Sequence, residues 1–194
     1  KKSAAAYAKI WWDEGSPLVV ISKRMHEKVK QLVDVPVALA MRYGNPSMMA
    51  GLKELQDKGV TEVMLFPLYP QHAMASTTTI LELAEDLRKK HFPEMTFTNV
   101  PAFYNKPDYI KNLADFEYDH LLFSYHGIPE RHIRKTDITK SHCKIDGSCC
   151  NTPSPAHEFC YRHQCYETTK QVVKLLGIPE GKYSQTFQSR LAGD

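Results

Sequence analysis

The feature that most constrains the fold is a regular alternation between short β-branched runs and longer segments with helical periodicity. The β-branched runs predict strands at residues 18–22, 35–43, 63–69, 120–125 and 183–188, and a weaker strand at 95–100. Helical periodicity predicts helices at residues 25–33, 47–58, 79–91 and 167–176. Such alternation is typical of parallel sheets whose strands are joined by crossover helices. The sequence therefore predicts an α/β fold.

A change of composition at residues 91–101 predicts a boundary between two half-domains. We expect an amino-terminal half at 1–94, a carboxyl-terminal half at 95–194 and a cleft between them. In open α/β sheets, ligands bind outside the carboxyl ends of the strands. Reactive or aromatic side chains stand at the carboxyl ends of several predicted strands: Arg42 and Tyr43, Tyr69, and His126. The expected cleft is therefore lined from several strands.

Composition excludes several other classes of protein. Of the 194 residues, 42% are hydrophobic and 24% are charged, which is typical of a folded globular chain. The net charge is only +3 and the two signs are interspersed, so nucleic acid is not an expected partner. No apolar run approaches the ~18 residues that span a bilayer, and the first seven residues, Lys-Lys-Ser-Ala-Ala-Ala-Tyr, lack the apolar core of a signal peptide. We therefore expect a cytoplasmic protein.

His126 is the strongest single candidate for chemistry. It ends a predicted strand and is followed by Gly127, so its imidazole is expected at an exposed turn held by a rigid strand. An imidazole there can act as a base or as a metal ligand, whereas a hydrogen-bonded structural histidine is the alternative. Arg42, Tyr43 and Tyr69 can orient an aromatic, anionic ligand, but packing and rim positions use the same residue types.

All five cysteines lie between Cys143 and Cys165, which favours a local ligand cluster over a disulfide framework. Four thiolates within about 20 residues are enough to hold an iron–sulfur cluster. Zinc is the rival ligand, because His142, His157 and His163 are interleaved with the cysteines. Paired Cys-x2-Cys spacings are absent, so the iron–sulfur cluster is favoured over zinc, and free thiols are the third interpretation.

Several blocks of sequence, in order along the chain, resemble the ferrochelatase family. They are Met41-Arg42-Tyr43-Gly44-Asn45-Pro46, Leu68-Tyr69-Pro70-Gln71, Ser76-Thr77-Thr78, Leu122-Phe123-Ser124-Tyr125-His126-Gly127-Ile128-Pro129 and Phe187-Gln188-Ser189-Arg190. The resemblance implies two flavodoxin-like or Rossmann-like parallel-sheet half-domains of chelatase type. It also implies that ferrous iron is inserted into a porphyrin, with protoporphyrin IX preferred over coproporphyrin III.

The same resemblance implies roles for individual residues. His126 matches the family's active-site histidine, which is either the acceptor of the pyrrole protons or a ligand of the substrate iron. The positions that match porphyrin-contacting residues are Tyr7, Ser16, Arg42, Tyr43 and Tyr69. The family's opening strand, its porphyrin-lip segment and its later acidic residues are not matched, and the stretch 109–119 is shorter than the helix expected there. We therefore expect an incomplete site and no iron insertion by these residues alone.

The segment 138–161 resembles the internal cysteine-rich insertion that holds a 2Fe-2S cluster in some bacterial ferrochelatases. This implies Cys143, Cys149, Cys150 and Cys160 as ligands, whereas Cys165 lies in a segment that also occurs without the insertion. Two alternatives stay open: a cobalt or nickel chelatase of another tetrapyrrole pathway, and a non-catalytic iron–sulfur module that senses redox state or iron. Contact with the inner membrane is a further expectation, because porphyrins are lipid-soluble. The oligomeric state is left open.

Overall fold

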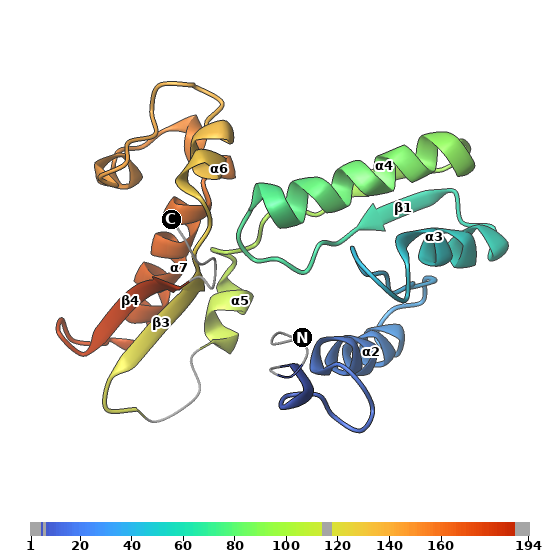
Figure 1. Cartoon of the computed structure of the whole chain (residues 1–194), viewed down its shortest axis with the longest axis horizontal. Helices are drawn as coiled ribbons and strands as arrows, with labels where there is room; N and C mark the ends of the chain where they lie inside the picture. Colours follow the sequence, from blue (N-terminus) through green and yellow to red (C-terminus); the bar gives the residue numbers. More distant parts are fainter. Residues whose placement is uncertain (1–4, 6, 114–117, 189–194) are drawn as a thin grey trace. The chain divides into compact units, whose positions relative to one another are not determined.

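A computed structural model describes residues 5, 7–113 and 118–188 of the chain (Figure 1). It divides into two compact units, which are described separately. The first unit comprises residues 1–65 and 82–98, and the second comprises residues 66–81 and 99–194. The division into half-domains at residues 94 and 95, with a cleft between them, stays a prediction.

The first unit is built around a small core between helices and a two-stranded sheet. Its elements are α2 (Pro17–Lys30), α3 (Met48–Asp57), β1 (Glu62–Leu65), most of α4 (Thr79–His91) and β2 (Thr96–Asn99). Strands β1 and β2 are neighbours in the sheet. The core residues are Leu52, Leu55, Val63, Phe92 and Met95. Because these side chains come from α3, from β1 and from the two ends of the α4–β2 connection, their burial joins the helices to the sheet.

The prediction of a strand at 18–22 is wrong, because these residues lie in the first turns of α2. Pro17 occupies the first helical turn, where its fixed φ and missing N–H cost nothing. Intrinsic propensity is a weak prior, and a helix satisfies its backbone hydrogen bonds locally, whereas a strand needs a paired neighbour. Lys28 and Lys30 lie in the last turn, where positive charge is favourable. The helix predicted from residue 25 therefore begins eight residues earlier.

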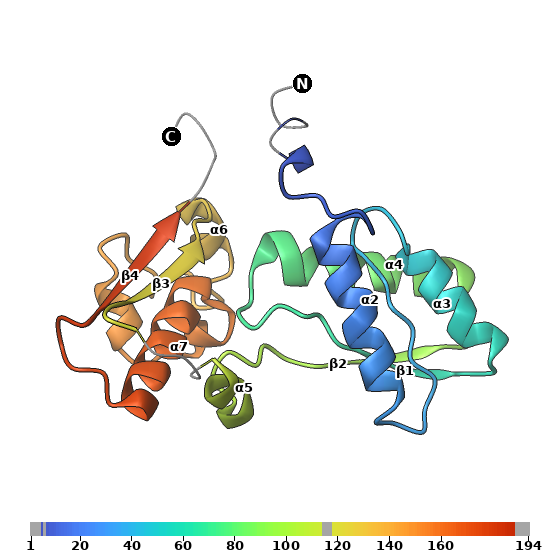
Figure 2. The ribbon, with the colours of Figure 1, turned by 90° about the horizontal axis from the view of Figure 1, so that it is seen from below.

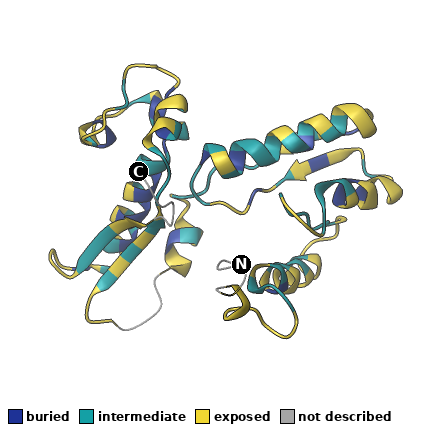
Figure 3. Cartoon of the chain, viewed as in Figure 1, coloured by how far each residue is buried: buried dark blue, intermediate teal, exposed yellow. Residues whose placement is uncertain are grey.

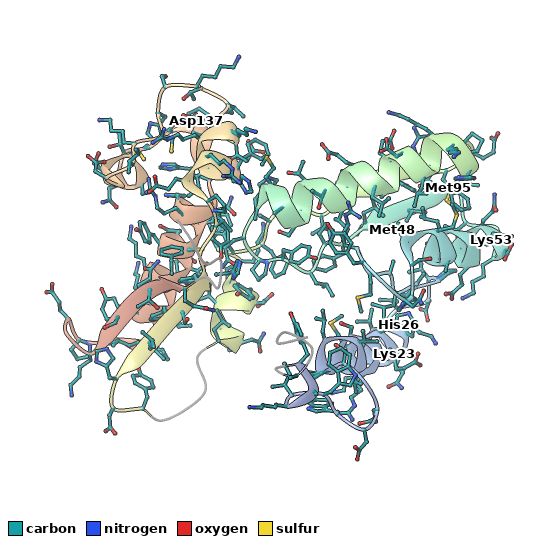
Figure 4. All side chains as sticks on the ribbon, viewed as in Figure 1. Lys23, His26, Met48, Lys53, Met95 and Asp137 are labelled. Carbon is teal, nitrogen blue, oxygen red and sulfur yellow. The ribbon has the colours of Figure 1, made fainter. Side chains whose placement is uncertain are left out.

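The strand predicted at 35–43 is wrong as well. Within the described residues this segment forms only an isolated bridge between Met41 and Ser47. Pro36 removes one backbone donor, and no strand in the described part of the chain pairs with the segment. The segment is instead held by helices: His26 Nε2–H on α2 donates to the Val37 carbonyl at 3.0 Å (Figure 4). An added Cβ at Gly51 on α3 would lie 3.3 Å from the Ala40 Cβ, so glycine permits this close approach.

The second unit contains a parallel strand pair with a helix packed on one face. Strand β3 (Leu121–His126) pairs with β4 (Tyr183–Gln188) in register from Leu121 with Tyr183 to His126 with Gln188 (Figure 2). Helix α7 (Tyr161–Leu176) ends at Gly177, which adopts the left-handed conformation with φ 60°, and the Ile178 N–H bonds back to the Val173 carbonyl. The chain thus mixes helices with small parallel sheets, as the alternation predicts.

Shorter elements complete the second unit. They are the π-helical turn Met74–Thr78, α5 (Pro107–Asn112), α6 (Glu130–Lys135) and the 3-10 turns Ser148–Asn151 and Pro155–Phe159. Residues 114–117 lie outside the described residues, so the expected shortening at 109–119 stays a prediction. Among the described residues, no helix is long and apolar enough to cross a membrane.

Candidate functional site

His126 is the last residue of β3, and its side chain is on the exposed face of that strand. Half-buried and exposed residues alternate along β3, and Leu122, Ser124 and His126 are the exposed ones (Figure 3). Beyond the strand, the Gly127 N–H donates to the Gln188 carbonyl at 2.7 Å and extends the ladder by one bond. The backbone that carries the imidazole is therefore fixed while the imidazole itself is open to a ligand.

The opposite face of β3 is anchored to α7. The Tyr125 hydroxyl lies 2.9 Å from Thr169 Oγ1, and burial raises the pKa of Tyr125 to about 12. Burial also raises the pKa of Tyr161 on α7, whose hydroxyl interacts with the backbone of His126. Both phenols are therefore neutral at pH 7 and serve to hold the strand. Sequence reasoning missed this anchoring, because a Thr in a helix gives no sign of a partner 44 residues away.

Arg42 and Tyr43 are presented on a closed loop of the first unit. The Met41 N–H donates to the Pro46 carbonyl at 2.8 Å, and Gly44 takes up the left-handed φ of 77° that the loop needs. The Arg42 guanidinium carbon lies 4.6 Å from the centre of the Tyr43 ring, and Tyr43 is 76% exposed. The pair thus offers an aromatic face and a positive charge at one place.

The other predicted pocket residues are placed as follows. Tyr7 is exposed, and its ring is perpendicular to that of Trp11, with 6.2 Å between the ring centres. Ser16 precedes α2, and its hydroxyl makes no capping bond to that helix. Tyr7 and Ser16 share the first unit with Arg42 and Tyr43, whereas Tyr69 and His126 belong to the second. The joint pocket of all six therefore stays a prediction.

The cysteine-rich loop, residues 138–161, is directly preceded by a buried carboxylate, Asp137 (Figure 4). Its Oδ1 accepts from the Thr139 N–H at 2.9 Å and the Thr139 hydroxyl at 2.7 Å. Its Oδ2 accepts from the N–H groups of His142 at 2.9 Å and Cys143 at 2.8 Å. Burial alone would raise the pKa of Asp137, but these bonds outweigh it and lower the pKa to about 2. Sequence reasoning missed Asp137, although Asp-x-Thr is a common turn former that could have indicated it.

We predict that Asp137 makes the stability of the loop depend on pH. A carboxyl with a folded pKa of about 2 and an unfolded pKa of about 3.9 stabilises the fold above pH 4, and this contribution is lost as pH falls toward 2. Asp137→Asn should lower the free energy of unfolding at pH 7 by about 2 kcal/mol. Melting curves between pH 2 and 7 measure both effects.

The control for Asp137 is Asp146→Asn in the same loop, because Asp146 is exposed and its hydrogen bonds are to Ser148 alone among the described contacts, with the Ser148 N–H at 2.9 Å. This variant should lose less stability than Asp137→Asn. An Asp137→Asn variant with the same acid dependence as the original chain would contradict the assignment.

Four thiols of the loop interact with one another. Cys149, Cys150 and Cys160 are buried, and Cys143 is half-buried. A hydrogen bond between the Cys150 and Cys160 side chains raises the pKa of Cys150 and lowers that of Cys160. Burial, and then the charge of Cys149, raise the pKa of Cys143. None of the five cysteines forms a disulfide.

Arg162, in the first turn of α7, places a positive charge beside these sulfurs. Its guanidinium donates to the Ile145 carbonyl at 3.0 Å and lies 3.8 Å from Cys149 Sγ. Burial lowers the pKa of Arg162, but hydrogen bonds and charge interactions with Cys150 and Cys149 outweigh burial and raise the pKa above its ordinary value. The loop is therefore closed onto α7 by a cation that favours thiolates. This residue was also missed, because only the folded loop brings it to the cysteines.

His142 and His157 of the loop and His163 of α7 contact one another and the backbone of the loop. The Nε2 atoms of His142 and His157 are 3.3 Å apart, and they lie 3.0 and 3.2 Å from the Cys149 carbonyl oxygen. His157 stacks on His163 with 3.6 Å between ring centres. Within the described ranges, no group of three or more His, Cys, Asp or Glu side chains is arranged to hold a metal ion. Neither a zinc site nor a cluster site is therefore shown.

An α/β architecture with an exposed imidazole at the end of a parallel strand and an Arg–Tyr pair on a closed loop is that of a protein that binds its ligand at the carboxyl ends of its strands. A model of the family described as Ferrochelatase matches residues 1–194. A ferrochelatase of Pseudomonas syringae pv. tomato is 45% identical over 98% of this chain and 58% of its own length. The ferrochelatase of Pseudomonas fluorescens is 44% identical over 98% of this chain and 59% of its own length. That of Opitutus terrae is 40% identical over 99% of this chain and 58% of its own length. The chain belongs to the ferrochelatase family, and it spans about 58% of the length of the curated relatives it matches.

Proposed function

We propose that the full-length protein that contains this chain inserts ferrous iron into a porphyrin during haem synthesis. Membership of the ferrochelatase family over the whole chain supports this function. The observation that carries it is the exposed imidazole of His126, which the ladder of β3 and β4 holds within the signature-like block 122–129. Porphyrin and ferrous iron are the proposed substrates, and protoporphyrin IX is the preferred porphyrin.

The reaction requires a group that accepts protons. Ferrous iron enters the macrocycle as two pyrrole N–H protons leave, so the products are the iron porphyrin and two protons. A neutral imidazole can accept such a proton, or it can hold the incoming iron before transfer. His126 is the proposed group for either role. The Arg42–Tyr43 pair, together with Tyr7, Ser16 and Tyr69, is proposed to bind the flat, anionic ring.

We further propose that Cys143, Cys149, Cys150 and Cys160 hold a 2Fe-2S cluster. The donor set fits, because the four thiols lie in one irregular loop and interact with one another. Arg162 supports the proposal, since its charge offsets the negative charge of four thiolates. The cluster would supply one-electron redox chemistry. A cytoplasmic location with peripheral contact to the inner membrane completes the proposal.

Substrate selectivity tests the proposed function. The full-length protein is incubated anaerobically with ferrous iron and protoporphyrin IX, with ferrous iron and coproporphyrin III, or with cobalt and an early tetrapyrrole. We expect the fastest formation of the metal complex with protoporphyrin IX. Turnover with only cobalt and the early tetrapyrrole would assign the protein to another chelatase pathway and overturn the proposal.

We predict that residues 1–194 alone do not insert iron, because the acidic side chain opposite the histidine in the family is not matched in this sequence. The chain alone is assayed beside the full-length protein under the same anaerobic conditions, and only the full-length protein should form the iron porphyrin. Insertion of iron or zinc by the 194 residues alone would show that the opposing carboxylate is dispensable.

A further inference from the structure

Gln164 on α7 is a fully buried polar side chain that joins two segments far apart in the sequence. Its Oε1 accepts a hydrogen bond of 2.6 Å from the backbone N–H of His72. Its Nε2 donates to the carbonyls of His157 at 3.2 Å and Glu158 at 2.7 Å. One amide group thus connects the loop that follows Tyr69 with the last turn of the cysteine-rich loop.

A second side chain of α7, one turn further on, holds the same loop. Thr168 is also buried, and its Oγ1 accepts from Gln71 Nε2 at 3.1 Å. The Thr168 hydroxyl hydrogen is within reach of the carbonyls of Tyr104 at 3.0 Å and Gln164 at 2.9 Å. Two consecutive residues, Gln71 and His72, are therefore fixed by side chains on one face of α7. Pro70, which precedes Gln71, is also held, because its carbonyl accepts a hydrogen bond of 3.0 Å from the Phe103 N–H.

The chemistry of Gln164 points to a positional role. A buried amide costs free energy unless each polar atom is paired, and here both the oxygen and the nitrogen have partners. An apolar side chain of similar size would fill the same space, but it would leave the His72 N–H and the two carbonyls without these bonds. A fully satisfied buried polar group of this kind fixes one arrangement of the segments around it.

We propose that Gln164 is a positioning residue of the porphyrin pocket. It holds the loop 69–72, which carries Tyr69, in a fixed place and ties that loop to the end of the cysteine-rich loop. The same amide thereby links the loop that carries Tyr69 to the end of the cysteine-rich loop. This inference rests on the proposed function, because it takes Tyr69 to be a porphyrin contact.

Three variants of the full-length protein test the inference. Gln164→Met keeps the size of the side chain and removes all three hydrogen bonds. Gln164→Glu separates the two ends of the connection, because it retains an oxygen that accepts from the His72 N–H but lacks the N–H groups that donate to the carbonyls of His157 and Glu158. Gln171→Met is the matched control on the same helix, since among the described residues Gln171 Nε2 donates to Glu167 of α7 itself, at 3.0 Å. Amide exchange in the peptide 70–78, the KM for porphyrin and kcat are measured for each.

In Gln164→Met we expect exchange of the His72 amide to accelerate about tenfold, because its acceptor is lost. The KM for porphyrin should rise about tenfold while kcat changes less than about threefold, since a loop that binds the ring is displaced and the reacting groups are not. Gln164→Glu should restore slow exchange at His72, because the acceptor of that N–H is retained, and Gln171→Met should match the original protein. A melting temperature for each variant shows that it is folded.

Unchanged exchange at His72 in Gln164→Met would overturn the positioning role. Faster exchange with an unchanged KM would show that the loop does not bind the ring, which also overturns the inference. A failure of the proposed function would look different, because the original protein would then form no iron porphyrin while His72 still exchanged faster in Gln164→Met.

Discussion

Replacing His126 by Ala in the full-length protein is expected to lower kcat for iron insertion by about 10²- to 10⁴-fold, the usual contribution of a positioned acid–base group. The imidazole is on the exposed face of β3, and the backbone ladder that holds it does not involve the side chain. The melting temperature should therefore stay close to that of the original protein. Initial rates of iron porphyrin formation, measured anaerobically, give the change.

The matched control for His126 is His120→Ala. His120 precedes the other end of β3, is also exposed, and lies 2.9 Å from Ser184 Oγ. The His120→Ala variant should insert iron at a rate within about twofold of that of the original protein, because the site lies at the carboxyl ends of the strands. A rise in the KM for iron in His126→Ala would assign metal binding, whereas a fall in kcat alone would assign proton acceptance. A His126→Ala protein as active as the original would remove the histidine from the mechanism.

The second large effect is expected at the cysteine-rich loop. Replacing any one of its four candidate ligands by Ser should reduce the iron and sulfide content from about two of each per chain to almost none. The visible absorption and the paramagnetic resonance signal of the reduced protein should disappear with them. These ligands are Cys143, Cys149, Cys150 and Cys160. A serine hydroxyl is a harder and much less acidic donor than a cysteine thiol, so it is a poor substitute for the thiolate ligands of an iron–sulfur cluster.

Cys165→Ser is the control for these replacements. Cys165 is a fully buried core residue of α7, and burial raises the pKa of its thiol to about 12. The cluster should survive this replacement, although the loss of a buried thiol lowers stability. Loss of the absorption in Cys165→Ser would overturn the choice of four ligands, and zinc in place of iron would overturn the cluster itself.

The sequence predicts well those elements that local patterns determine. Helix α4 and strand β4 have the predicted bounds of 79–91 and 183–188. The strands predicted at 18–22 and 35–43 are wrong, because a strand depends on a paired neighbour that a local pattern does not reveal. Pro17, just before the first of these segments, is a local signal for the start of a helix there. Pro36, within the segment 35–43, is a local signal against a strand there.

Local patterns likewise predict one part of the candidate site and not the other. The exposed place of His126 at the end of β3 follows from the strand pattern and from the Gly that comes after it. The roles of Arg162 and Gln164 depend on contacts with segments that are separate in the sequence, such as the pair His72 and Gln164, which lie 92 residues apart. No periodicity or spacing in one sequence indicates such contacts.

The most direct test of the account is the initial rate of ferrous iron insertion into protoporphyrin IX by the full-length protein, measured anaerobically beside its His126→Ala variant. We expect iron porphyrin to form in proportion to protein concentration, and the variant to be slower by about two orders of magnitude or more. A rate that does not depend on the protein, or that is the same in the variant, would contradict the account.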